Sequence, residues 1–326
     1  MESHASPGTR SLVRRSLNSL IAVPTPVIFI AAAAIAGVLL WRRGALQDVA
    51  VAIRNADPWQ LGAILAAYSG SIFVLGMRWH VLVRMVEGSP AWTASSEVFL
   101  TSVIVNYAAP IGLAVPTRAA LSVRDLGLTP LQSGAVVAWE AGLDFAALAL
   151  VSAAWIAGSG AAALQPMPVD PRAVAAAATA CAGAVAATML IVRASAHGPR
   201  LAGAIRRTLA FPGQNPLLAA IAVVLTGAFW GTQIGVMALL LEVVGVSPAP
   251  SLLLGLMGLP ILIGMLSPVP GGAGVREGLM AAAARLEGEP VGPVVLAAVA
   301  YRLALFVVTP IVWGAVRFTR SHAARR

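Results

Sequence analysis

The sequence of 326 residues has little charge: Asp, Glu, Lys and Arg make up 11%, where a soluble domain carries about a quarter. Apolar residues make up 59%, and the mean hydropathy is +0.85. Apolar runs of roughly 20 residues are long enough to cross a bilayer as helices. The composition therefore excludes an ordinary soluble domain and predicts an all-α, polytopic membrane protein.

Cysteine and histidine are also scarce. The one cysteine, Cys181, lies in an apolar run, which leaves no disulfide framework and no cysteine metal site. The four histidines are scattered, and the sequence contains no Walker loop, no His-Glu-x-x-His run and no convincing Ser/His/Asp arrangement. We therefore expect neither a metal nor a cofactor.

Acidic residues are outnumbered, since the formal net charge is +9 and the excess is almost wholly arginine. These arginines lie between apolar runs, which favours contact with anionic lipid headgroups and fixing of topology over nucleic-acid binding. We expect anionic membrane lipids as partners, no nucleic acid, and a multi-pass location in a bacterial plasma (inner) membrane. The sequence also has no soluble stretch long enough for a separate catalytic domain.

Apolar stretches of spanning length predict six transmembrane helices. Two further apolar stretches, 92–128 and 251–286, are interrupted midway by Pro and Gly. Their halves of roughly 12 to 16 residues, about 18 to 24 Å, are too short to cross alone, so we interpret both as re-entrant helical hairpins. The six predicted spans are 24–41, 59–79, 131–157, 172–192, 216–241 and 291–317.

Arginine-rich connections predict the orientation, with both termini in the cytoplasm. The segment 42–57 is the exception, because its arginines must then lie outside. The order of elements in 24–157 recurs in 172–317, with the first hairpin entering from the cytoplasm and the second from outside. This pattern is typical of an inverted-topology repeat, which in transporters places the binding site at the midplane. The predicted organisation is a tail at 1–23, one transmembrane domain at 24–318 and a basic tail at 319–326.

The second interrupted stretch carries the clearest candidate site, in the sequence 267–278. A helix that begins after a glycine-rich break directs free N–H groups inward, and a nearby cation completes an anion site. Arg276 could hold a phosphate or another anionic headgroup, or it could pair with Glu277 and lock the hairpin. The predicted headgroup-binding residues here are Gly271, Gly272, Gly274, Arg276 and Glu277, with the break at Pro270.

Arg118 occupies the comparable place after the first break and could serve the same purpose or lie at the interface. That break falls at Pro110 and Gly112, and Asn106 just before it could satisfy the freed backbone groups. Arg78 and Arg84 flank the inner end of the second span, where we favour topology anchors over ligands.

Two carboxylates lie in the middle of a predicted span, where insertion of a charge costs roughly 2.5 to 3.5 kcal/mol. Glu140 and Asp144 are four residues apart, so they share one face of a helix. Arg302, beside Tyr301, lies near the middle of the last span. We expect these residues to meet in an intramembrane polar centre, either as a static ion-pair lock, which we favour, or as a coupled gate.

The motifs resemble a known family. The sequence Pro-Gly-Gly-Ala-Gly-Val-Arg-Glu-Gly at 270–278 is similar to the PGG-x-G-x-x-E pattern of the lysylphosphatidylglycerol synthase transmembrane region family. Matches at 77–79, 116–118 and 301–303 follow in the same order, so the resemblance covers about residues 20–318. Ala141 stands where this family usually has arginine, between Glu140 and Asp144.

That family includes the flippase half of MprF and many stand-alone membrane proteins. The resemblance therefore implies a transporter of an anionic or polyprenyl-linked lipid between leaflets, and no lysyl transfer, because that chemistry belongs to an appended soluble domain. The alternatives are an integral membrane enzyme acting on a lipid phosphate or glycolipid, with Glu140, Asp144 or Glu277 as base, and a non-catalytic partner of an envelope glycosyltransferase or other lipid-modifying enzyme.

Overall fold

The computed structural model describes residues 56–86, 88–108, 114–160, 198–266 and 274–323, together with Val51, Arg54 and Gly272. All the elements in these ranges are helices, which confirms the all-α prediction. Four of them are long and apolar enough to cross a membrane: α4 (Pro58–Met85), α7 (Pro130–Trp155), α11 (Pro216–Val243) and α15 (Val291–Ala323). They correspond to four predicted spans, and the spans predicted at 24–41 and 172–192 lie outside the described residues.

Local sequence explains where the long helices begin. Proline occupies the first helical position of α4, α7 and α11, where it removes an N–H that has no helical partner anyway. At the start of α7, the Thr129 side chain accepts from the Gln132 N–H, and Gln132 Oε1 accepts from the Thr129 N–H. This capping box fixes the turn that precedes the span. At the other end, α7 runs on into a π-helical turn, Ile156–Gly160.

Two helices continue beyond their predicted ends. The sequence predicted that the second span stops at Trp79, but α4 runs on to Met85, because Val81, Leu82, Val83 and Met85 are apolar and buried. Residues 319–323, which we assigned to the tail, extend α15 to Ala323.

Short helices lie on both sides of each predicted break. The first pair is α5 (Trp92–Ala108) and α6 (Ala114–Leu126), which pack against each other. The second group is α12 (Pro250–Met257), α13 (Leu259–Leu266) and α14 (Val275–Leu286). The break residues Pro110, Gly112, Pro270 and Gly271 lie outside the described part.

The helix expected before the second break is itself divided at Gly258. A Cβ at Gly258 would lie 2.8 Å from Ser152 Oγ, so only glycine permits this approach to α7. Pro260 follows, and its ring cannot continue the hydrogen-bond ladder of the preceding helix. The break between α12 and α13 is therefore caused by the close contact of Gly258 with α7 together with Pro260.

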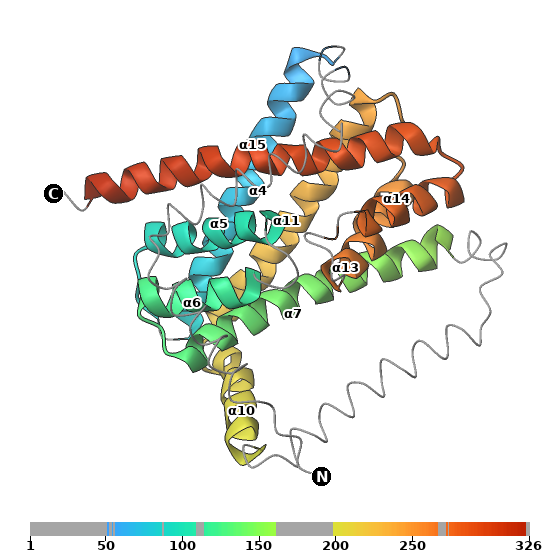
Figure 1. Cartoon of the computed structure of the whole chain (residues 1–326). Helices are drawn as coiled ribbons and strands as arrows, with labels where there is room; N and C mark the ends of the chain where they lie inside the picture. Colours follow the sequence, from blue (N-terminus) through green and yellow to red (C-terminus); the bar gives the residue numbers. More distant parts are fainter. Residues whose placement is uncertain are drawn as a thin grey trace, which may run out of the picture.

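The long helices α4 and α11 pack along each other in the middle of the molecule (Figure 1). Both contact α15 and α7, which cross them in the view of Figure 1 above and below. In addition, α5 packs on α15 and α6 on α7, while α12 and α13 pack on α7 and α14 on α15. Helix α10 (Gly198–Gln214), which precedes α11 in the chain and carries Arg206 and Arg207, contacts α7 and α11.

The outer surface of the long helices is apolar. Large apolar side chains are exposed on each of the four, among them Leu65, Leu150, Val224 and Ile311. Exposed apolar surface on this scale marks contact with a membrane or another apolar partner. By length, composition and surface, the described part is a multi-pass membrane protein.

Candidate functional site

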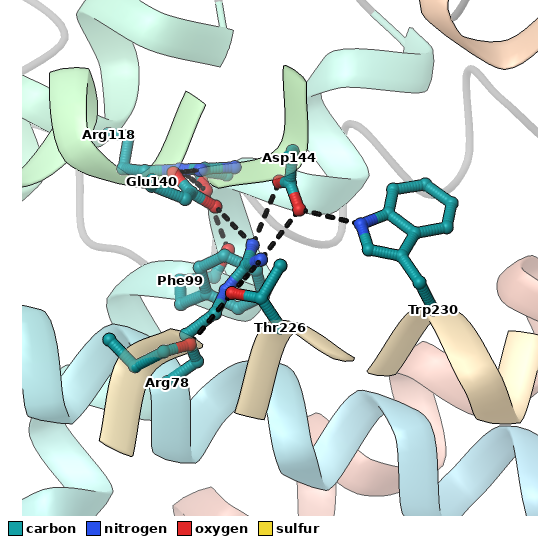
Figure 2. Close-up of polar contacts among 9 residues, drawn as sticks. Arg78, Phe99, Arg118, Glu140, Asp144, Thr226 and Trp230 are labelled. Carbon is teal, nitrogen blue, oxygen red and sulfur yellow. Dashed lines mark hydrogen bonds and ion pairs between the residues drawn. The ribbon is translucent and has the colours of Figure 1, made fainter. Parts of the chain in front are cut away.

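A largely buried group of four charged residues joins α4, α6 and α7 (Figure 2). Arg78 binds Asp144 with two hydrogen bonds, Nη1 to Oδ1 at 2.6 Å and Nη2 to Oδ2 at 2.9 Å. Its Nη2 also lies 3.6 Å from Glu140 Oε1, and the Arg78 side chain is only 1% exposed. Such a bidentate contact is the strongest arrangement that an arginine and a carboxylate can make.

Arg118 of α6 completes this first cluster. It binds Glu140 Oε2 and donates from Nε to Ser102 Oγ at 2.7 Å. Its guanidinium carbon lies 4.7 Å from the centre of the Phe99 ring, where cation–π attraction adds to the ion pair. Glu140 therefore lies between two arginines that come from different helices.

Two residues of α11 close the first cluster. The Thr226 hydroxyl accepts from Arg78 Nη1 at 3.3 Å, and Trp230 Nε1 donates to Asp144 Oδ1 at 3.0 Å. Two arginines and two carboxylates have formal charges that cancel. This group therefore has the composition of a static ion-pair network.

Two predictions about this cluster were wrong. Arg78 is buried against Asp144 and is not an anchor at the membrane surface. Glu140 and Asp144 pair with Arg78 and Arg118, and no ion pair joins either of them to Arg302 in the described part of the chain. The apolar run that continues past Arg78 through residues 81–83 could have revealed that this arginine lies within a longer helix. Nothing in the sequence singled out Thr226 or Trp230.

The second cluster lies where α14 meets α15. The Gly274 N–H donates to Glu277 Oε2 at 2.6 Å, and Arg302 Nη1 lies 2.9 Å from Glu277 Oε1. Glu277 thus caps the start of α14 with one oxygen and binds α15 with the other. Because both of its oxygens are engaged, Glu277 positions the loop and the helix and does not present a free carboxylate.

Arg276 is the unusual member of this second cluster. It is 8% exposed, and its guanidinium carbon lies 4.7 Å from the centre of the Tyr301 ring. Its Nη2 is buried and has no hydrogen-bond partner, and Arg276 forms no ion pair with any carboxylate of the described residues. The alternative in which Arg276 pairs with Glu277 and locks the hairpin is therefore not found, because Glu277 binds Arg302.

Gly272, shortly before α14, lies close against Gly264 of α13. Gly272 has φ of +66°, and a Cβ there would lie 2.7 Å from the Gly264 carbonyl oxygen. A Cβ on Gly264 would in turn lie 3.3 Å from Arg276 Cβ. The close backbone approach predicted at Gly272 is made to α13, which also lies against Arg276. Gly274 also has a positive φ, +87°, at the start of α14.

The remaining predicted residues are placed only in part. Asn106 lies in the last turn of α5, and its side chain is outside the described part, as are Pro110, Gly112, Pro270 and Gly271. Tyr301 contacts Arg276 and lies edge-on to Tyr68, with ring centres 5.6 Å apart. No three His, Cys, Asp or Glu side chains of the described ranges are grouped so that they could hold a metal ion.

One buried carboxylate escaped the sequence analysis. Glu97 of α5 is 1% exposed and binds Arg317 at 2.5 Å and Arg320 at 2.7 Å, both from the C-terminal part of α15. Arg320 was predicted to belong to the cytoplasmic basic tail at 319–326. Its pairing with Glu97 ties α15 to the first pair of short helices.

Long apolar helices that enclose paired arginines and carboxylates, with short helices between them, define a multi-pass helical membrane protein with a polar interior. The family model of the lysylphosphatidylglycerol synthase TM region matches residues 27–314, and the chain belongs to that family. The resemblance drawn from the motif at 270–278 is thereby confirmed. A comparison with curated proteins found no match.

Proposed function

We propose that this protein moves an anionic lipid, or a polyprenyl-linked lipid, between the leaflets of the membrane, and that Arg276 binds the headgroup. The observation that carries this proposal is a buried guanidinium whose Nη2 has no partner. A buried charge without a counter-charge costs several kcal/mol, and a bound anion removes that cost. Membrane lipids supply anions at this location, and the family is one of membrane proteins.

The charge balance of the two clusters supports the choice of Arg276. The first cluster sets two arginines against two carboxylates and is neutral. The second sets Arg276 and Arg302 against Glu277, and Glu277 already binds Arg302. The surplus positive charge therefore lies on Arg276, which also has the ring of Tyr301 on one face. Arg118, by contrast, would have to release Glu140 before it could bind a headgroup.

An inverted repeat with two re-entrant hairpins is consistent with the helix contacts. The central pair α4 and α11 would be equivalent, and exchange of the halves converts the contact of α5 with α15 into that of α12 and α13 with α7. The same exchange converts the contact of α6 with α7 into that of α14 with α15. Each hairpin would then enter from one leaflet and bring Arg118 or Arg276 toward the interior.

The enzyme alternative has less support from the geometry. Its base would have to be Glu140, Asp144 or Glu277, and each of these binds at least one arginine. A base whose oxygens already accept from arginine has fewer lone pairs to receive a substrate proton. We accordingly propose transport, in a bacterial inner membrane with both termini cytoplasmic, and with an envelope glycosyltransferase or another lipid-modifying enzyme as a possible partner.

Purified protein in liposomes tests the proposal directly. Fluorescent phosphatidylglycerol and fluorescent phosphatidylcholine are placed in both leaflets, and dithionite quenching reports which molecules reach the outer leaflet. We expect faster movement of the anionic lipid than in protein-free liposomes, and a smaller effect on the zwitterionic lipid. Rates equal to those of empty liposomes for phosphatidylglycerol and for a polyprenyl phosphate would overturn the proposal.

A further inference from the structure

We propose that a second site, at the end of α4, binds the phosphate group of an anionic lipid at the membrane surface. The site is a cavity of about 310 Å³ lined by His80, Arg84, Ser89, Pro90 and Trp92. This volume falls within the range of ligand pockets. The cavity lies where the span Pro58–Met85 ends, which is the depth expected of lipid headgroups.

The lining offers donors of the kind that bind phosphate, and none of its five residues is acidic. The Arg84 side chain is exposed and makes no hydrogen bond or ion pair with another described residue. His80 Nδ1 lies 3.3 Å from Ser95 Oγ, and the buried Trp92 Nε1 has no hydrogen-bond partner. A phosphate here would meet one unpaired guanidinium with polar groups around it, which is a charge-assisted arrangement.

An apolar flank distinguishes a lipid from free phosphate. One face of α4 carries four residues at the spacing i, i+4, i+7 and i+11: Phe73, Met77, His80 and Arg84. The first two form the apolar flank, and the last two line the pocket. Phe73 is 50% exposed, and its ring centre lies 5.4 Å from that of Trp92. The distance along the helix from Phe73 to Arg84 is about 16 Å, so a headgroup at Arg84 would leave an acyl chain beside Phe73.

This site is separate from Arg276 and does not depend on transport. Its residues belong to α4, the connection after it and the start of α5, whereas Arg276 lies on α14. Loss of binding at one site therefore leaves the other open to test. The pocket could hold lipid in a protein that moves none.

A local probe within the pocket provides the test. The chain has eight tryptophans, so protein labelled with 5-fluorotryptophan gives a small set of ¹⁹F signals, and Trp92→Phe assigns the one from Trp92. Dihexanoyl phosphatidylglycerol, below its micelle concentration, and inorganic phosphate are titrated separately. We expect the Trp92 signal to move saturably with the lipid, and Arg84→Ala to weaken this binding roughly tenfold or more.

Two controls decide between the possible outcomes. Arg206→Ala removes another exposed arginine, which lies on α10 outside the pocket, and should leave the titration unchanged. Phe73→Ala should weaken the lipid and not inorganic phosphate. A Trp92 signal that stays fixed in the wild-type protein, or equal losses in Arg84→Ala and Arg206→Ala, would overturn the site. Equal binding of inorganic phosphate, with no effect of Phe73→Ala, would show a site for free phosphate and overturn the lipid assignment.

Discussion

Glu277 of α14 and Arg302 of α15 form an ion pair of 2.9 Å, with side chains that are 15% and 10% exposed. In the first half of the chain, Arg118 of α6 binds Glu140 of α7. In both halves the last short helix is thus tied to the long helix that follows it, with the charges exchanged. The consequence for function is that Glu277 is engaged elsewhere and Arg276, its neighbour in sequence, keeps a buried guanidinium nitrogen without a partner.

The Glu277–Arg302 pair predicts rescue by charge exchange. Arg302→Glu places two carboxylates together in a largely buried setting, and we expect a loss of about 3 to 5 kcal/mol in the free energy of unfolding. The double variant Glu277→Arg/Arg302→Glu should recover part of this loss, because opposite charges face each other again. Equilibrium unfolding in detergent measures both. The single variant Glu277→Arg completes the comparison. If the double variant loses as much free energy of unfolding as the two single variants lose together, the two residues are not coupled.

The Arg78–Asp144 pair should be a major source of stability. Asp144→Ala leaves Arg78 buried at 1% exposure beside Glu140 alone, so we expect a loss of about 3 to 5 kcal/mol. Asp125→Ala is the control, because the Arg124 and Asp125 side chains are 20% and 19% exposed, and a more exposed ion pair contributes less than a buried one. Similar midpoints of unfolding for the two variants would contradict a structural role for the first cluster.

Gly272 should not tolerate a side chain. In Gly272→Ala the new Cβ would lie 2.7 Å from the Gly264 carbonyl oxygen, and the positive φ adds about 1 to 2 kcal/mol of strain. The control is Gly278→Ala, since Gly278 has open space around it within helix α14 and alanine there should stabilise by about 0.5 to 1 kcal/mol. Opposite shifts in the midpoint of thermal unfolding are expected, and a neutral Gly272→Ala would show that the loop does not need this approach.

Much of this architecture could be predicted from the sequence. Apolar runs located α4, α7, α11 and α15, and Pro and Gly located the two breaks between short helices. The motif at 270–278 identified Arg276 and Glu277 as a linked pair of candidates. These features depend on local composition and spacing, which a single sequence displays.

The pairing of charges could not be predicted, because it depends on contacts distant in the chain. Arg78 and Asp144 are separated by 66 positions and meet only when α4 packs on α7. Arg302 was expected beside Glu140 and Asp144 because all three lie near the middle of their spans. In the fold Arg302 binds Glu277 instead, since depth in the membrane does not say which helices are neighbours.

Re-entrant hairpins predict that each tip is reached from one side only. In a background with Cys181→Ser, cysteine at Ala91, an exposed residue before α5, should react with a membrane-impermeant maleimide from the cytoplasm. Cysteine at Ser247, exposed before α12, should react from outside. A cysteine in place of Ile111, between α5 and α6, should stay unreactive from outside. Its labelling from outside would show that the first hairpin crosses the bilayer.

The most direct test of the central claim compares two arginines of α14 in the proteoliposome assay with fluorescent phosphatidylglycerol. Arg276→Ala removes the buried guanidinium, and Arg285→Ala removes an exposed one from the same helix. Because a hydrogen bond to a charged group contributes about 1.5 to 3 kcal/mol, we expect Arg276→Ala to slow translocation by roughly tenfold or more while Arg285→Ala leaves it near the wild-type rate. Equal rates for folded Arg276→Ala and wild-type protein would contradict the account.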